Sequence, residues 1–186
     1  MKSLTAIKAN FQEVPAFIRL FLKRAILLFI FWKLLYHLIL FPLRIPDHQL
    51  STLTAISTGY IYQALFGGTI TYAQDYAGSY PLIKLFLNGN RSVGIADGCN
   101  ALELYVLFAG FIICLATTIK RQLQFIGVGF LVIYMINNCR CVALAWMHAN
   151  GYATDFAHHY VFKAIIYAII FYMWMRYCRK FYFDEK

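Results

Sequence analysis

The chain has 186 residues, enough for one domain, and 61% of them are hydrophobic while only 13% are charged. Soluble domains are about 45–50% apolar and about 25% charged, so this composition excludes an ordinary soluble globule and indicates a protein whose surface faces lipid. The formal net charge of +9 does not indicate nucleic-acid binding, because the basic residues flank apolar runs and no basic groove or base-stacking motif is visible.

Four apolar runs approach the length of about 20 residues that a membrane-spanning helix needs. In chain order they are residues 25–43, 101–118, 123–145 and 160–174. The sequence therefore predicts an all-α fold, a polytopic transmembrane helix bundle in which residues 1–186 form a single integral membrane domain. Residues 1–24 carry scattered charge and no signal-peptide cleavage site, so we expect them to form a cytoplasmic amphipathic lead-in.

The basic residues predict how these helices are oriented in the membrane. They cluster at Lys23 and Arg24, at Lys120 and Arg121, and at Arg176, Arg179 and Lys180. By the positive-inside rule, the start of the first span, the end of the second span and the C-terminus are cytoplasmic. Residues 44–100 then begin and end outside. Within them, residues 51–70 form an interfacial or re-entrant segment, or one of two crossings, so we predict four firm spans with six as the alternative.

This topology predicts a polar pocket at the outer face of the membrane. Cys99 lies at the outer start of the second span, and Arg140 lies roughly 8 Å below the outer end of the third. His158 and His159 open the fourth span. These residue types suit acyl transfer: a thiolate attacks, a histidine takes the thiol proton and returns it to the leaving amine, and an arginine stabilises the oxyanion.

Three further residues are candidates for supporting this pocket. Asn137 precedes Arg140 by three residues on the same helix face, so it could orient the guanidinium or join two helices through hydrogen bonds. Glu103 follows Cys99 by one turn and could pair with Arg140 or line the pocket. Asp97 is the other candidate partner for Arg140.

Each candidate also has a purely structural interpretation. Cys99 could be an inert buried thiol, and the two histidines could be interfacial residues that reach to water. An arginine inside a span is costly and usually marks a site. We expect His148 to be a solvated loop residue. No histidines combine with carboxylates or thiols at ligand spacing, so the sequence predicts no metal and no cofactor.

Three blocks of the sequence resemble the signature of the exosortase/archaeosortase family. They are DGCNALELYVLFAGF, NNCRCVALA and AHHYVFKAIIYAIIF, and they define a catalytic signature region over residues 94–175. The family is similar in its ordered cysteine, arginine and histidine at the outer ends of successive membrane helices. Within that family, the short length and the histidine in the third block resemble the compact bacterial exosortases of the Bacteroidetes type.

The resemblance implies roles for individual residues. The nucleophile falls on Cys99 and the arginine on Arg140. The third catalytic residue falls on His159, because Tyr167 then takes the place of an aromatic residue often found eight positions later. His158 remains the alternative.

The resemblance also implies an activity. Such a protein would be a membrane-embedded cysteine protease or transpeptidase of the bacterial inner membrane, with both termini cytoplasmic and the active site on the extracytoplasmic face. Its substrates would be secreted proteins with a C-terminal sorting signal: a short motif, a transmembrane helix and a basic tail. Cleavage through a thioester acyl-enzyme would transfer them to a cell-surface acceptor, a lipid or a glycan. Membrane lipids are the other expected partners, and nucleic acid is not.

Two other hypotheses stay open. The chain could be a small transporter or anion-binding membrane protein that uses Arg140 and Lys33. It could also be a subunit that packs against a partner through the small-residue face of Gly127 and Gly129. A transporter would have charged residues through the depth of the membrane or two similar halves. Only Lys33 lies deep in a span and the sequence has no two similar halves, so the enzyme hypothesis is favoured over the transporter hypothesis.

Overall fold

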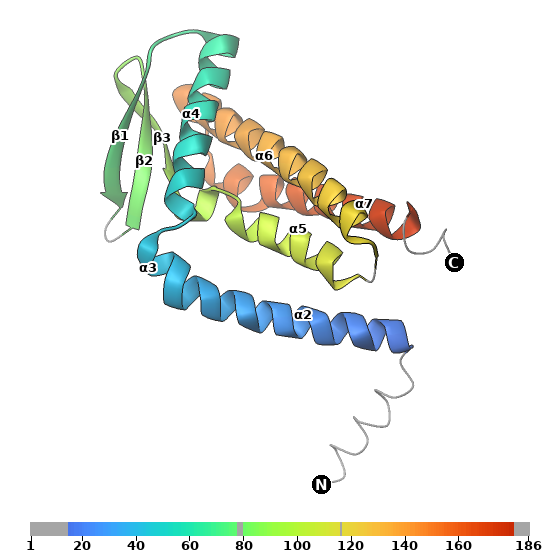
Figure 1. Cartoon of the computed structure of the whole chain (residues 1–186). Coiled ribbons are helices and arrows are strands. Elements are labelled where there is room, and N and C mark those ends of the chain that lie inside the picture. The colour runs from blue at the N-terminus through green and yellow to red at the C-terminus, as the bar shows by residue number, and fades with distance from the viewer. Residues whose placement is uncertain (1–14, 78–79, 116, 181–186) are drawn as a thin grey trace.

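The computed structural model describes residues 15–77, 80–115 and 117–180, and most of them are helical (Figure 1). The helices are α2 (Ala16–Leu35), α3 (Phe41–Leu43), α4 (Asp47–Phe66), α5 (Leu102–Cys114), α6 (Ile119–Ala149) and α7 (Phe162–Cys178). π-helical turns at Tyr36–Leu40 and Ala157–Val161 extend α2 and α7. The strands are β1 (Ile70–Ala77), β2 (Tyr80–Leu87) and β3 (Asn90–Ala96).

Three helical stretches are long and apolar enough to cross a membrane, which indicates a membrane protein. They are Ala16–Leu43, Ile119–Ala149 and Ala157–Cys178. These helices confirm three of the four predicted spans. The first begins earlier than predicted, so residues 16–24 of the expected cytoplasmic lead-in belong to this helix. Residues 1–14 of the lead-in lie outside the described residues.

The prediction of four firm spans, or six, is wrong for the described part of the chain. The predicted second span is represented by α5, which has 13 residues. At about 1.5 Å per residue this helix is about 20 Å long, against about 30 Å of bilayer hydrocarbon. Its apolar character reflects burial within the protein, since Phe108 and Ile112 are fully buried. A short apolar run has the same composition whether it faces lipid or other helices.

The predicted interfacial segment, residues 51–70, forms most of α4 and the first residue of β1. The buried residues of α4 include Asp47, Ser51, Thr54 and Thr58, so this helix lacks the apolar character of a span. Figure 1 shows α4 standing across one end of the bundle, whereas α2, α5, α6 and α7 run along its length. We call this end, which also carries the strands, the sheet end.

The prediction of an all-α fold is wrong as well, because residues 70–96 form an antiparallel sheet in the order β1-β2-β3. Alternate side chains of β2, Ile83, Leu85 and Leu87, are buried against α4 and α6. The β2–β3 hairpin turns at Asn88 and Gly89, with φ of 51° and 80°. An Asn-Gly pair between alternating apolar residues is a strong signal for a β-hairpin. The many turn-forming residues around it made the segment resemble a loop in the sequence.

The largest hydrophobic core lies where α5 packs against α6 and α7. Its buried members include Tyr105 and Phe108 of α5, Ile133 of α6 and Ile170 of α7. Gly129 on α6 permits this close approach, because a Cβ at that position would lie 2.0 Å from the Phe108 ring. At Gly129, therefore, the small residue serves packing within this chain.

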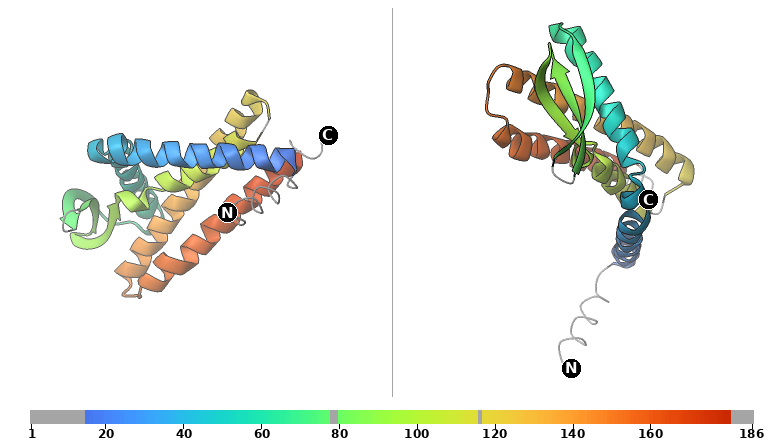
Figure 2. Two further views of the ribbon diagram at one scale, coloured as in Figure 1. Left: turned by 90° about the horizontal axis from the view of Figure 1, so that it is seen from below. Right: turned by 90° about the vertical axis from the view of Figure 1, so that its left-hand side faces the viewer.

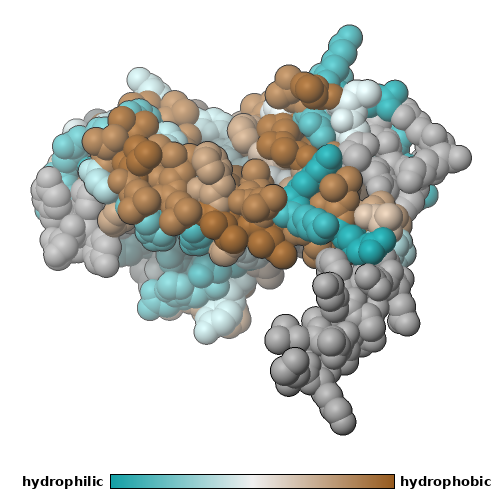
Figure 3. Space-filling view, turned by 60° about the horizontal axis from the view of Figure 1, so that its bottom comes forward, coloured by the Kyte–Doolittle hydropathy of each residue, from teal (hydrophilic) through white to brown (hydrophobic). Residues whose placement is uncertain are grey.

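The two ends of the bundle differ in chemistry. The starts of α2 and α6 and the end of α7 lie together at the end opposite the sheet (Figures 1 and 2). Lys120 lies in the first turn of α6 and Arg176 lies in the last turn of α7. Lys23 and Arg24 lie about two turns into α2, and the Arg24 guanidinium reaches the same end of the bundle, where it donates a hydrogen bond to the carbonyl oxygen of Cys114, the last residue of α5. In Figure 3 a continuous hydrophobic band faces the viewer and gives way to hydrophilic residues near the N-terminal segment. The basic clusters that predicted topology thus share one end of the molecule.

Candidate active site

A cavity of about 370 Å³ lies at the sheet end, between β3, α6 and the start of α7. Cys99, Arg140 and His158 line it, although they come from separate parts of the chain. The other lining residues are Ser92, Val93, Gly94, Ile95, Cys141, Leu144, His148 and Thr154. The predicted cysteine and arginine and the alternative histidine, His158, therefore border one space, which we call the sheet-end cavity, while His159 is not among its lining residues.

Cys99 closes a single 3₁₀ turn, Asp97–Cys99, which joins the end of β3 to the start of α5. Ala101 then adopts a left-handed conformation with φ of 65°, and α5 begins at Leu102. Cys99 is half-buried and stands just before the N-terminus of that helix. The positive end of a helix dipole favours a nearby anion, so this position suits a thiolate.

Asn137 of α6 holds the backbone of this turn. Its Nδ2 donates a hydrogen bond to the Cys99 carbonyl oxygen at 2.9 Å, and its side chain is buried. The sequence predicted that Asn137 would orient Arg140 or join helices. In the structure it links the long helix α6 to the segment that carries the cysteine.

Asp97 anchors the same turn from the other side. Its carboxylate accepts hydrogen bonds from Nε and Nη2 of Arg44, at 3.1 and 3.0 Å, and from Oγ of Ser51 at 2.9 Å. A two-point contact between guanidinium and carboxylate fixes orientation as well as charge. Asp97 therefore pairs with Arg44, just before α4, and not with Arg140, for which it was one of two candidate partners.

Asn100 completes the fixation of the turn and is almost fully buried. Its Nδ2 donates to Oδ1 of Asp47 at 2.8 Å, while its Oδ1 accepts from the backbone N–H of Leu102 at 2.9 Å. The residues on both sides of Cys99 are thus tied to α4 and α5. A side chain on a turn held in this way has a fixed starting point and needs little reorganisation to meet a ligand in the cavity.

Arg140 borders the cavity without a counter-charge. Its Nε is buried and has no hydrogen-bond partner, and no carboxylate lies within salt-bridge distance among the described residues. Glu103, the other predicted partner, is exposed on α5 and does not line the cavity. The arginine charge is therefore available to a group that enters the cavity.

The two histidines occupy the π-helical turn Ala157–Val161, with ring centroids 4.8 Å apart. π-turns are rare and occur frequently at functional sites. His158 is half-buried and lines the cavity, whereas His159 is exposed and is not part of the lining. Neighbouring helix positions point in different directions, so only one of the pair can face Cys99 and Arg140. The structure brings His158, the alternative, to this space.

Sequence reasoning missed several residues of this cavity. His148, which we expected to be a solvated loop residue, is exposed but lies in the last turn of α6, where it lines the cavity with Leu144. Arg140, Leu144 and His148 are spaced at i, i+4 and i+8, which places them on one helix face. This spacing in the sequence could have indicated that His148 lies near Arg140. Thr154 and strand β3 had no comparable signal, because their approach depends on the tertiary fold.

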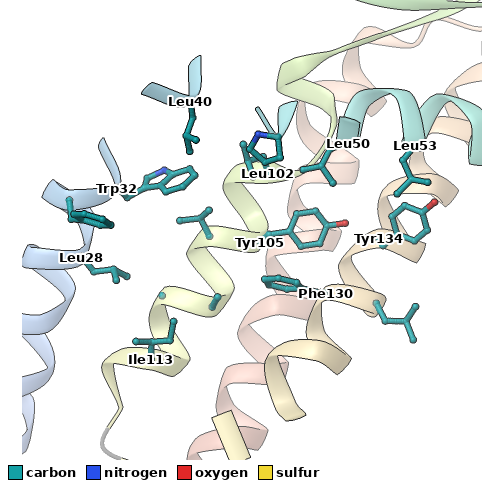
Figure 4. A pocket seen from close by; sticks show the side chains of 16 residues that line it. Leu28, Trp32, Leu40, Leu50, Leu53, Leu102, Tyr105, Ile113, Phe130 and Tyr134 are labelled. Carbon is teal, nitrogen blue, oxygen red and sulfur yellow. The ribbon is translucent and has the colours of Figure 1, made fainter. Parts of the chain in front are cut away.

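A second cavity, of about 790 Å³, lies between α2, α4, α5 and α6, and we call it the bundle cavity. Its lining is aliphatic and aromatic and includes Leu28, Trp32, Tyr105, Ile113 and Phe130. Figure 4 shows Leu28 and Trp32 of α2 reaching towards α5. No cysteine, histidine or charged side chain lines this cavity, so it lacks the groups that acyl transfer needs.

The transporter hypothesis would bring Lys33 and Arg140 into one cavity. Lys33 is exposed on α2, its Nζ lies 5.9 Å from the centroid of the Phe29 ring, and it does not line the sheet-end cavity. In the part of the chain that the structure describes, no three His, Cys, Asp or Glu side chains are grouped to hold a metal ion. The absence of a metal stays a prediction.

Comparisons with protein-family models, with curated proteins and with solved structures find no match.

Proposed function

We propose that this chain is a membrane-embedded cysteine peptidase or transpeptidase of the exosortase/archaeosortase type. One observation carries the proposal: Cys99, Arg140 and His158, from three separate elements, border the sheet-end cavity. A cysteine and a histidine on one cavity, with an arginine that has no carboxylate partner among the described residues, form an arrangement suited to acyl transfer. The blocks that resemble the family contain all three residues, with His158 in the role that the resemblance gives to His159.

The first half of the reaction acylates the enzyme. His158 takes the proton of the Cys99 thiol, and the thiolate attacks a backbone carbonyl carbon of the substrate. As the sulfur–carbon bond forms, negative charge moves to the carbonyl oxygen, where the guanidinium of Arg140 stabilises it. Collapse of this intermediate breaks the carbon–nitrogen bond. The leaving amine receives the proton from His158, and a thioester remains on Cys99.

The second half releases the acyl group. An acceptor amine, or water, attacks the thioester carbon while His158 takes its proton. The carbon–sulfur bond breaks, and His158 returns the proton to the sulfur of Cys99. An amine acceptor yields a new amide and thus transfer, whereas water yields hydrolysis.

We also propose the orientation and the substrates. By the positive-inside rule, the basic end of the bundle is cytoplasmic, so the sheet-end cavity faces the extracytoplasmic side of the bacterial inner membrane. The substrates are secreted proteins whose C-terminal sorting signal combines a short motif, a transmembrane helix and a basic tail. The acceptor is a lipid or a surface glycan. This part of the proposal rests on the resemblance of the three sequence blocks.

Thiol labelling in sealed, right-side-out membrane vesicles tests the site and its orientation together. Cys139 is exposed, so the background carries Cys139→Ser. A membrane-impermeant maleimide is expected to label Cys99 from outside at pH 7. His158→Ala should slow this labelling at least about tenfold at pH 7, because the imidazole no longer accepts the thiol proton. A Cys99 that is inert, or that labels only from the cytoplasmic side, would overturn the proposal.

A further inference from the structure

Strand β3 is an edge strand of the sheet. It pairs with β2 on one side, and no other strand pairs with it among the described residues. Outside the ladder, the described backbone-to-backbone hydrogen bonds include none made by residues 90–96. An open strand edge presents N–H and C=O groups to any extended chain that comes alongside, and proteins usually cover or interrupt such edges.

The backbone of β3 borders the sheet-end cavity. Ser92, Val93, Gly94 and Ile95 all line it. Gly94 has no side chain, so it borders the cavity through its main chain. The position is also closely packed, since a Cβ there would lie 3.2 Å from Leu82 of the neighbouring strand.

A bulge modifies the strand at the same place. The register passes from Leu85 opposite Val93 to Phe86 opposite Arg91, which leaves Ser92 as the extra residue. Ser92 then turns towards α6, where its Oγ lies 3.5 Å from the Ala145 carbonyl oxygen. Bulges are common beside active sites, where they end strand pairing or redirect a side chain.

The same strand leads directly to the nucleophile. Ile95 and Ala96 end β3, and the turn that follows closes at Cys99. Arg140 on α6 and His158 at the start of α7 lie on other walls of the cavity. A chain laid along this edge would therefore run past the strand end into the group of side chains that performs the proposed chemistry.

We propose that the substrate binds as an extended peptide that adds a strand to the free edge of β3 and presents its scissile carbonyl to Cys99. This inference rests on the proposed function and adds how that substrate is recognised. The four lining residues of β3 give about 13 Å of edge, enough for roughly four substrate residues at about 3.3 Å each. Main-chain hydrogen bonds provide affinity in this mode, and alternate side chains provide specificity.

Backbone methylation of a peptide substrate tests this binding mode. The purified full-length protein in lipid nanodiscs is incubated with a positional-scanning library of ten-residue peptides. Acylation is read as added mass on the intact protein that hydroxylamine removes and that Cys99→Ala lacks. The best peptide is then remade with a single N-methyl group at each position in turn. N-methylation at alternate residues should slow acylation at least tenfold, while the intervening positions change it less than twofold.

The period of two is the decisive result, because alternate N–H groups of an extended peptide face its strand partner. Acylation whose methylation profile has no such period would overturn the strand-edge inference and leave the proposed function standing. A peptide library that never acylates Cys99 would overturn the proposed function, and this inference would fall with it.

Discussion

The sheet-end cavity and the bundle cavity differ in size and in chemistry, and the two criteria select different sites. The bundle cavity is the larger, about 790 Å³ against about 370 Å³. Its walls are hydrocarbon and aromatic rings, whereas the sheet-end cavity has a thiol, imidazoles and a guanidinium. Acyl transfer needs a nucleophile, a proton acceptor and a stabiliser of negative charge, so the proposed function belongs to the smaller cavity.

The surroundings of the two cavities explain the difference. At the sheet end, Asn137 and Asn100 donate hydrogen bonds and Asp97 accepts from Arg44, and these contacts fix the cysteine turn to α4, α5 and α6. The bundle cavity lies beside α2, whose apolar window has no buried residues, whereas 44% of the corresponding window of α6 is buried. A fixed polar wall suits chemistry, and an apolar wall beside a weakly buried helix suits contact with lipid. Substitutions at the two sites should therefore differ in effect. Replacing Cys99 should abolish acylation, whereas a substitution beside the bundle cavity should leave the acylation rate almost unchanged.

Cys99→Ala should abolish acylation in the peptide assay, because the thioester forms on its sulfur. Cys141→Ala is the matched control, since Cys141 lines the same cavity but is buried. The control is expected to keep its acylation rate within about threefold, with the added mass read on the intact protein. Acylation that persists without Cys99 would move the nucleophile elsewhere.

Arg140→Ala should slow acylation by about 10²–10³-fold, the usual cost of removing one stabiliser of a developing oxyanion. The acylation rate of Arg140→Lys should lie between those of Arg140→Ala and the wild type. Lysine keeps the positive charge but lacks the planar guanidinium that donates two parallel hydrogen bonds. Single-turnover rates at saturating peptide measure the effect. Glu103→Gln, which alters an exposed carboxylate outside the cavity, is the control and should leave the rate unchanged. A wild-type acylation rate in Arg140→Ala would show that this arginine has a structural role and does not stabilise the oxyanion.

His158→Ala should slow acylation at pH 7 by at least about 10²-fold, since general-base catalysis contributes about 10²–10⁴. His159→Ala is its matched neighbour and should cost less than about threefold. The comparison uses the same single-turnover assay on both variants. The opposite ranking would restore the assignment that the sequence resemblance favours.

Asp97→Asn removes the charge of the carboxylate that accepts from Arg44 and Ser51, with little change of shape. The pair is partly exposed, so we expect a loss of about 1 kcal/mol in stability and a slower acylation step, by roughly fivefold. Thermal unfolding and single-turnover rates measure the two effects. Asp75→Asn, at the ion pair with Lys84 on the sheet, is the control and should leave acylation unchanged. A Cys99 turn that needs no anchor would show equal rates in both variants.

Gly110→Ala should have the smallest effect on acylation. A Cβ at Gly110 would lie 2.7 Å from Cδ2 of Leu28, so Leu28 and the adjoining wall of the bundle cavity must shift. Acylation by short soluble peptides is nevertheless expected to stay within twofold, because none of the cavity's lining residues takes part in the chemistry. A loss above tenfold in a protein of normal thermal stability would show that the two cavities are coupled.

Much of this architecture follows from local sequence. The runs that form Ala16–Leu43, Ile119–Ala149 and Ala157–Cys178 were predictable because hydrophobic length is a property of the run itself. The β2–β3 hairpin was also within reach, through Asn88-Gly89 and the alternation of Ile83, Leu85 and Leu87. Arg140 stands out in the sequence alone, because an arginine inside an apolar run is costly in a membrane and usually marks a site.

The sequence by itself determined the membrane character of the chain and the residues, Cys99 and Arg140, around which the candidate site forms. The tertiary structure alone decided which histidine faces them, because His158 and His159 differ only in where the π-turn directs each ring. It also decided that Asp97 pairs with Arg44, 53 positions away in the chain. Which residues pair at such separations depends on how helices and strands pack together, and this packing cannot be derived from composition or local residue spacing.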